Sequence, residues 1–140
     1  MKLATIVSDA SFCHNTKAGG WAAWVVCENI RYQKSDIFKT KCNTSSEAEV
    51  LAAINGIWLA TKHFKNVERF HVVSDCQHVI NLIENQEGNE WKEIKKIVGK
   101  AVVTAKWVKS HDNNNSARSW VNRWCDKHAK KKMREQKFSN

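Results

Sequence analysis

The sequence predicts an α/β fold built on a mixed β-sheet, and two observations lead to that prediction. The first third of the chain alternates short apolar runs with turn residues, which is typical of an antiparallel meander. From about residue 46, helical and strand patterns alternate, which favours parallel strands with helices packed on the faces of the sheet. The 140 residues fit one domain, spanning 1–140, that buries roughly two-thirds of its unfolded surface.

Three strands are expected first. Residues 2–7 form a short apolar run that should end just before Asp9, and residues 21–27 form a second run after a Gly-Gly turn signal. Residues 31–39 mix apolar and polar side chains, as a more exposed strand does. Together these runs predict the meander.

A long helix is expected from Ser46, because the apolar residues then recur at helical spacing. That apolar stripe is Val50, Leu51, Ile54, Ile57, Trp58 and Thr61. The remaining expected elements are a strand at 70–73, helices opening at Asp75 and spanning 90–99, a strand at 101–108, a loop at 110–116 and a last helix at 117–136.

The tryptophans offer two interpretations. Trp58 and Trp107 lie in apolar stripes, as do two tryptophans of the second strand, so core packing is expected for these four. Trp91, Trp120 and Trp124 lie beside basic residues, where stacking on a nucleic-acid base and burial both remain open.

The formal net charge of +9 is distributed unevenly along the chain. Residues 1–87 hold nine basic and nine acidic side chains, whereas residues 88–140 hold fourteen basic and five acidic ones. A basic region beside a neutral body is typical of proteins with a polyanionic partner, most often nucleic acid. A solvated surface is the alternative explanation.

The chain has no pattern typical of a secreted or membrane protein. Its five cysteines are an odd number without a C-x-x-C pair, so neither a disulfide framework nor a zinc site is expected. No apolar run approaches the roughly 18 residues of a membrane span, and the start lacks a signal peptide's apolar stretch. We therefore expect a cytoplasmic monomer without membrane contact.

Four acidic residues stand where this layout brings chain ends together. Asp9 follows the first strand, Glu49 lies in the first turn of the first helix, Asp75 follows the fourth strand, and Asp126 lies on the last helix. Clustered carboxylates raise one another's pKa values unless divalent cations neutralise them. Hard oxygen ligands point to Mg²⁺ or Mn²⁺.

Each acid taken singly also has a structural explanation. The acid after the first strand is a turn residue, and Asp75 caps its helix. In the same way, Glu49 completes a capping box by bonding back to Ser46, and Asp126 pairs with Lys130 four residues later. The joint arrangement of the four acids and their flanking segments favours the functional interpretation.

Those flanking segments resemble the type 1 ribonuclease H family, in the same order and over nearly the whole chain. SDASFCHNTKAGGWAAWVV resembles the family's first strand and double-Gly hairpin, TSSEAEVLAAI its glutamate-bearing segment, and VVSDCQHVINLI the segment of its next aspartate. KWVKSH resembles the strand and loop before the family's histidine, and NRWCDKHA resembles the helix that carries its fourth acid. The segment between Asp75 and Trp107 is too short for the extra basic helix of some bacterial members, so the chain resembles a handle-less form.

The resemblance implies a ribonuclease H-like fold, with a mixed five-stranded sheet flanked by helices. It also implies a metal-dependent endoribonuclease that hydrolyses the RNA strand of RNA–DNA hybrids with two Mg²⁺ ions, or Mn²⁺. Asp9 would bridge both ions, Asp75 would hold the ion that activates the attacking water, and Glu49 with Asp126 would hold the one facing the leaving oxygen. His111 would shuttle a proton or help the product leave.

A substrate-binding surface also follows from the resemblance. Its predicted residues are Asn15, Thr44, Ser45, Gln77, Lys92, Lys95 and Lys96. The first four match or replace family positions that contact nucleic acid. The three lysines share one face of the expected third helix and would compensate for the absent basic helix, with a solvated surface as the alternative.

Two other functions compete with removal of primers or hybrid loops during DNA replication. One is a related nuclease of the same fold that cuts another polynucleotide. The other is a non-catalytic nucleic-acid-binding module, which would be expected to lose at least one carboxylate. The order of the motifs disfavours the first, and the presence of all four acids disfavours the second.

Overall fold

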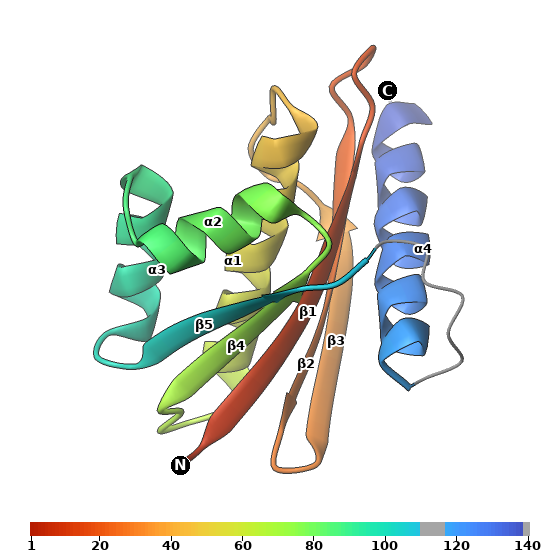
Figure 1. The fold of residues 1–140 in the computed structure, drawn as a ribbon. Helices are drawn as coiled ribbons and strands as arrows, with labels where there is room; N and C mark the ends of the chain where they lie inside the picture. The colour runs from red at the N-terminus through yellow and green to blue at the C-terminus, as the bar shows by residue number, and fades with distance from the viewer. Residues whose placement is uncertain (110–116, 139–140) are drawn as a thin grey trace.

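The computed structural model describes residues 1–109 and 117–138, in which a five-stranded sheet is flanked by helices (Figure 1). The elements in chain order are β1 (Leu3–Phe12), β2 (Gly19–Cys27), β3 (Ile30–Ile37), α1 (Ser45–His63), β4 (Arg69–Ser74), α2 (Gln77–Asn85), α3 (Asn89–Val98), β5 (Val102–Trp107) and α4 (Ala117–Phe138). The expected loop at 110–116, with His111 in it, lies outside the described residues.

The sheet is mixed, as predicted. Its strand order is β3-β2-β1-β4-β5, with β1, β2 and β3 antiparallel and β1, β4 and β5 parallel. Parallel neighbours place their carboxyl ends at the same edge of a sheet. Asp9, two residues beyond the last β1–β4 pair, and Asp75, which follows β4, are therefore brought to the same edge.

Helices cover both faces of the sheet. Successive strand residues point to opposite faces, and the buried clusters follow that alternation. Ile6 and Ala23 pack in the cluster that includes buried residues of α1, α2 and α3, whereas the adjacent Val7 and Ala22 pack with Cys125 of α4. The sheet thus lies between three helices on one face and α4 on the other (Figure 1).

Gly20 of β2 lets α4 approach the sheet closely. A Cβ atom at this position would collide with the backbone of α4, at the nitrogen of Met133 and 2.5 Å from the carbonyl oxygen of Ala129. Because backbone atoms cannot move aside as a flexible side chain does, the position requires glycine. The contact fixes the height of α4, and of Asp126 on it, above the sheet.

The first strand is longer than the sequence predicts. β1 continues through Asp9 to Phe12, because β2 stays paired with it as far as Phe12 and Gly19. On its other side, β1 pairs with β4 only as far as Val7 and Val73. Asp9 therefore lies within a strand that is held on one side only, and it is not a turn residue.

The prediction that Trp58 and Trp107 are core residues is wrong, since they are 55% and 49% exposed. In α1 the buried face is made largely of small residues such as Ala52, Ala53 and Gly56, which allow the helix to lie close to the sheet. Trp58 lies outside that buried face and lines a pocket beside β3 with Tyr32 and Lys34. Trp107 closes the edge strand β5, where one side of the sheet is open.

The three tryptophans with two open interpretations fall into different environments. Trp91 belongs to α3 and is buried. Trp120 and Trp124 both meet Trp24 edge to face, with ring centroids 5.3 and 5.4 Å apart, although Trp120 is half exposed. Packing of α4 on β2 explains these contacts.

Among the described residues, no helix is long and apolar enough to cross a membrane.

Candidate active site

Carboxylates gather where β4 leaves β1. Asp9 on β1, Glu49 on α1 and Asp75 just after β4 each offer an oxygen atom, and these oxygens lie within 4.8 Å of one another. All three side chains are half-buried. The structure thus brings together three of the four predicted acids, from segments up to 66 residues apart in the sequence, at the expected edge of the sheet.

A backbone N–H positions two of these carboxylates. Beyond the last β1–β4 pair, the Ala10 N–H donates to Asp9 Oδ1 and to Glu49 Oε1, both at 2.9 Å. Glu49 therefore does not complete a capping box with Ser46. Instead, the Thr44 hydroxyl accepts a hydrogen bond from the Glu47 N–H at the start of α1.

Asp75 is held through its backbone. The Trp107 indole Nε1–H donates to the Asp75 carbonyl oxygen at 3.1 Å, and the Ser74 hydroxyl accepts from the Cys76 N–H at 3.1 Å. Asp75 does not cap α2, whose N-cap residue is Cys76. Sequence analysis missed the positioning contact of Trp107, and the only signal for it was an aromatic residue at the end of a strand.

Asp126 approaches the cluster from the opposite face of the sheet. The preceding residue, Cys125, is fully buried, and its thiol lies 3.6 Å from the Val7 carbonyl oxygen, which anchors this turn of α4 on β1. Asp126 Oδ2 accepts a hydrogen bond from Lys130 Nζ at 3.0 Å, so the structural explanation of this residue also holds. Its negative charge nevertheless reaches Asp9 and contributes to the raised pKa of that carboxyl.

The electrostatics of the cluster are those of a site that favours cations. Burial raises the pKa of Asp9, and the charges of Asp75 and Asp126 raise it further. Burial and the charges of Asp9 and Asp75 likewise raise the pKa of Glu49 far above its usual range. Without a counter-charge, the folded chain therefore keeps protons on carboxyl groups that ionise readily in water.

This donor set fits divalent cations. Its ligand atoms are carboxylate oxygens, which suit Mg²⁺ and Mn²⁺, and no thiol or imidazole is among the three clustered donors. A bound cation would supply the positive charge that the raised pKa values show to be missing. Asp9, Glu49 and Asp75 are the residues that would hold it, with Asp126 next to them.

The predicted substrate-binding residues fall into two groups. Asn15 lies in the hairpin between β1 and β2, whereas Thr44, Ser45 and Gln77 lie at the N-termini of α1 and α2. All four are exposed, and they border the segments that carry the acids. Gln77 Nε2 donates to Asn81 Oδ1 at 3.0 Å.

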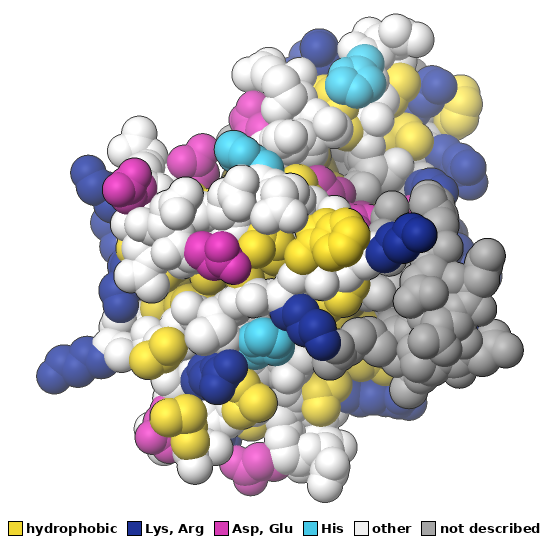
Figure 2. Space-filling view, viewed as in Figure 1, with side chains coloured by type: hydrophobic (Ala, Val, Ile, Leu, Met, Phe, Trp, Pro, Cys, Tyr) yellow, Lys and Arg dark blue, Asp and Glu magenta, His cyan; other side chains and the backbone are white. Residues whose placement is uncertain are grey.

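The second group lies apart from the first. Lys92, Lys95 and Lys96 are exposed on α3, which packs on α1 and α2 at the far side of the molecule from α4 (Figure 1). In the space-filling view, Lys and Arg side chains gather over this side and again beside the end of α4 (Figure 2). Basic side chains thus lie on both of these sides of the molecule.

Comparison with known proteins identifies the class to which this fold and site belong. Ribonuclease H of Campylobacter curvus is 27% identical to this chain, over 100% of the chain and 97% of that protein. The N-terminal RNase H domain of Rv2228c from Mycobacterium tuberculosis, solved as a fusion protein, has a TM-score of 0.76 at 15% identity, covering 99% of each chain. LC11-RNase H1, solved in complex with an RNA/DNA hybrid, has a TM-score of 0.70 at 15% identity, covering 94% of this chain and 97% of that one.

The family follows from the sequence itself. The family model for RNase H matches residues 1–134, so this chain belongs to the RNase H family. The family and the fold predicted from the sequence are thereby confirmed. The predicted enzyme class is confirmed as well, because the members of this family are endoribonucleases.

Proposed function

We propose that this chain hydrolyses the RNA strand of RNA–DNA hybrids, using divalent cations held by Asp9, Glu49, Asp75 and Asp126. The observation that carries the proposal is the carboxylate cluster at the divergence of β1 and β4, in a chain of the RNase H family. The hybrid bound to LC11-RNase H1 supports the same substrate here. Removal of primers or hybrid loops in the cytoplasm during DNA replication is the corresponding role.

The residues of this chain prepare the cluster for cation binding. The Ala10 N–H aligns the Asp9 and Glu49 carboxylates, and Trp107 fixes the backbone of Asp75. Two Mg²⁺ ions, or Mn²⁺, would stabilise the charge that develops on the attacking and leaving oxygens of the phosphodiester. A nucleophilic side chain is therefore unnecessary.

Substrate binding is assigned to groups beside the cluster. The N-termini of α1 and α2 present Thr44, Ser45 and Gln77, and helix N-termini favour phosphate oxygens through their free N–H groups and dipole. Asn15 would contact the hybrid from the hairpin. His111 is proposed to move a proton or assist product release.

The test uses end-labelled RNA–DNA hybrid, double-stranded RNA and double-stranded DNA, each with Mg²⁺, Mn²⁺ or chelator. Internal cuts confined to the RNA strand of the hybrid, and abolished by chelator, are expected. Equal cutting of double-stranded DNA would instead indicate a related nuclease with another substrate. Binding of the hybrid without any cleavage would indicate a binding module.

Variants test the assignment of the acids. Asp75→Asn should abolish cleavage but preserve or tighten hybrid binding, because it removes a negative charge that repels phosphate. Glu49→Gln should lose nearly all activity. Its matched control is Glu47→Gln, two residues away in the same turn, which should keep most of it. The reverse order of activities would show that Glu47 is the ligand.

A further inference from the structure

A basic pocket of about 480 Å³ lies at one end of the sheet, outside the carboxylate cluster. Three segments far apart in the sequence form it: the hairpin between β1 and β2, the loop between β3 and α1, and the end of α4. Its four basic residues are Lys17, Lys39, Lys41 and Lys137. None of the described residues that line it is Asp or Glu. We call it the four-lysine pocket.

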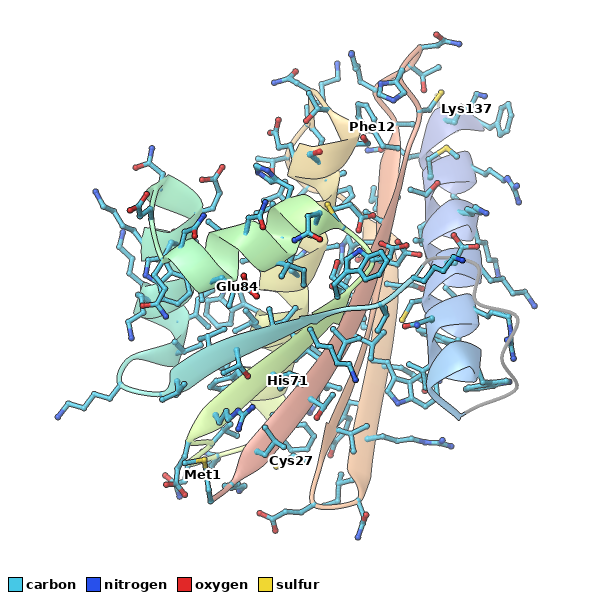
Figure 3. The ribbon with its side chains drawn as sticks, in the orientation of Figure 1. Met1, Phe12, Cys27, His71, Glu84 and Lys137 are labelled. Atoms are coloured by element: carbon cyan, nitrogen blue, oxygen red, sulfur yellow. The ribbon has the colours of Figure 1, made fainter. Side chains whose placement is uncertain are left out.

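The walls of the four-lysine pocket are fixed by specific contacts. The Gly19 N–H donates to Gln136 Oε1 at 2.6 Å, which ties the end of α4 to the hairpin. The Phe38 ring is buried against Gly19, where an added Cβ atom would lie 2.8 Å from the ring. Figure 3 labels Lys137 near the end of α4 and Phe12 at the end of β1, both at the same end of the molecule. The pocket is thus a built feature of the fold.

The ammonium groups of this pocket lack carboxylate partners within the described chain. Lys17 Nζ lies 3.4 Å from the Asn43 carbonyl oxygen, and Lys137 Nζ lies 5.6 Å from the centroid of the Phe138 ring. By contrast, Lys130 and Lys132 on the same helix form ion pairs with acids at 3.0 and 3.1 Å. The four lysine side chains that line this one hollow carry like charges, and a bound anion would relieve their mutual repulsion.

The chemistry favours a phosphate group. Lysine ammonium groups are compact charges that bind phosphate from any direction, and the lining offers little exposed apolar surface to anchor a peptide side chain, because Phe38 is buried. A backbone phosphate of a nucleic acid and free inorganic phosphate share this chemistry. The location of the pocket decides between them.

The four-lysine pocket lies in line with the carboxylate cluster. Gly19 on its rim pairs with Phe12, three residues beyond Asp9 on β1, which corresponds to about 10 Å along the strand. A strand with its reacting phosphate at the carboxylates would therefore carry another of its phosphates to the pocket within a few nucleotides.

We propose that the four-lysine pocket binds a backbone phosphate of the hybrid a few nucleotides from the cleaved bond. The proposal rests on the hybrid-cleaving function proposed above, and it adds a contact that anchors the substrate at the hairpin side of the active site. The observation that carries the proposal is that Lys17, Lys39 and Lys41 line the same pocket as Lys137, where the Gly19–Gln136 hydrogen bond joins the hairpin to α4.

The test combines charge removal in the protein with charge removal in the substrate. The pocket variant is Lys39→Gln/Lys137→Gln, and its matched control is Lys65→Gln/Lys100→Gln, which removes the same charge from exposed lysines near the starts of β4 and β5. Hybrids that carry a single uncharged methylphosphonate linkage at successive positions are measured for kcat/KM with Mg²⁺ and for Kd with chelator.

For the wild type and the control variant, a neutral linkage at one position a few nucleotides from the cut should weaken binding about twofold to fivefold. For the pocket variant, the same linkage should cause no further loss, because the contact is already gone. Lys39→Arg/Lys137→Arg should restore the positional effect. This pattern at one position separates a lost contact from misfolding, which would weaken binding at every position alike.

Other outcomes would overturn the proposal. One is an equal response of the pocket and control variants to every neutral linkage. Another is that inorganic phosphate or polyglutamate competes with the hybrid, that this competition needs the pocket lysines, and that no linkage position matters. That result would show a site for free anions or acidic peptides. If the wild type does not cleave the hybrid, the proposed function is refuted. The pocket contact is still tested in that case, because Kd is measured in chelator and does not depend on cleavage.

Discussion

Glu49→Gln should stabilise the metal-free protein while it destroys the activity. In the folded chain, burial and the neighbouring charges of Asp9 and Asp75 raise the pKa of Glu49 to about 10 from an ordinary value of 4.5. The contribution of Glu49 to the free energy of unfolding is therefore most favourable below its unfolded pKa of 4.5, and it becomes less favourable as the pH rises from there toward 10. Gln resembles the protonated acid, so it still accepts the Ala10 N–H but carries no proton to lose.

The size of the effect follows from the pKa shift. At pH 8, which is 3.5 pH units above the ordinary pKa of 4.5, the unfolded Glu49 is ionised, whereas the folded one keeps its proton. At about 1.4 kcal/mol for each unit, this costs the wild type about 5 kcal/mol in the limit of no solvent screening. Because the carboxyl is half-buried and water screens part of the effect, we expect Glu49→Gln to gain about 2–4 kcal/mol at pH 8.

Urea unfolding at pH 5 and pH 8 in chelator measures this gain. The two proteins should differ little at pH 5 and by the full amount at pH 8, and about 10 mM Mg²⁺ should narrow the difference by stabilising the wild type through its ionised carboxylates. Glu47→Gln is the control, because the Glu47 carboxylate accepts from the Asn43 N–H and lies outside the cluster. Equal free energies of unfolding at pH 8 would refute the electrostatic reasoning.

Three further predictions concern other parts of the molecule. Gly20→Ala should lower the free energy of unfolding by about 2–3 kcal/mol in urea, because its Cβ meets the backbone of α4; wild-type stability would show that α4 can shift at little cost. Lys92→Gln/Lys95→Gln/Lys96→Gln should raise KM and flatten the salt dependence of binding with little change in kcat, whereas an unchanged salt slope would mean that this face of α3 only meets solvent. Hydrogen bonding by Thr16 lowers the pKa of the Cys13 thiol to about 7, so iodoacetamide at pH 7.5 should alkylate Cys13 several-fold faster than the other cysteines, as judged by mass spectrometry, and Thr16→Val should slow that reaction. Faster labelling of Cys76 would contradict this last prediction.

The sheet and its helices could be predicted because periodicity reports burial directly. The apolar runs of β1 and β2, which pack against helices on both faces of the sheet, and the helical spacing in α1 reflect which side chains are buried. The errors arise at the margin of a buried face and where strand pairing depends on distant segments. Trp58 fits the helical spacing of the apolar stripe but lies outside the residues that α1 buries, and β1 extends past Asp9 because β2, which lies elsewhere in the sequence, stays paired with it.

The candidate acids could be predicted because each acid and the segment that flanks it are adjacent in the sequence. The groups that hold these acids in place could not be predicted. The Ala10 N–H is a backbone group, and nothing in the sequence marks it as the donor to Glu49. The contact of Trp107 with Asp75 crosses from β5 to the end of β4. Such contacts depend on the register of the sheet, which only the folded chain defines.

The same reasoning explains why charge counted along the sequence located only part of the basic surface. The net charge of residues 1–87 is zero, yet Lys17, Lys39 and Lys41 of the four-lysine pocket all belong to that segment. Three of its nine acids, Asp9, Glu49 and Asp75, converge in the carboxylate cluster, so their negative charge is concentrated at one site. Folding thus separates the charges of a neutral segment into an acidic site and a basic pocket at different places in the fold. This separation fits a polyanion that places its reacting phosphate at the cation-binding carboxylates and another phosphate at the lysines of the pocket. A uniform basic surface would attract the polyanion without fixing its position.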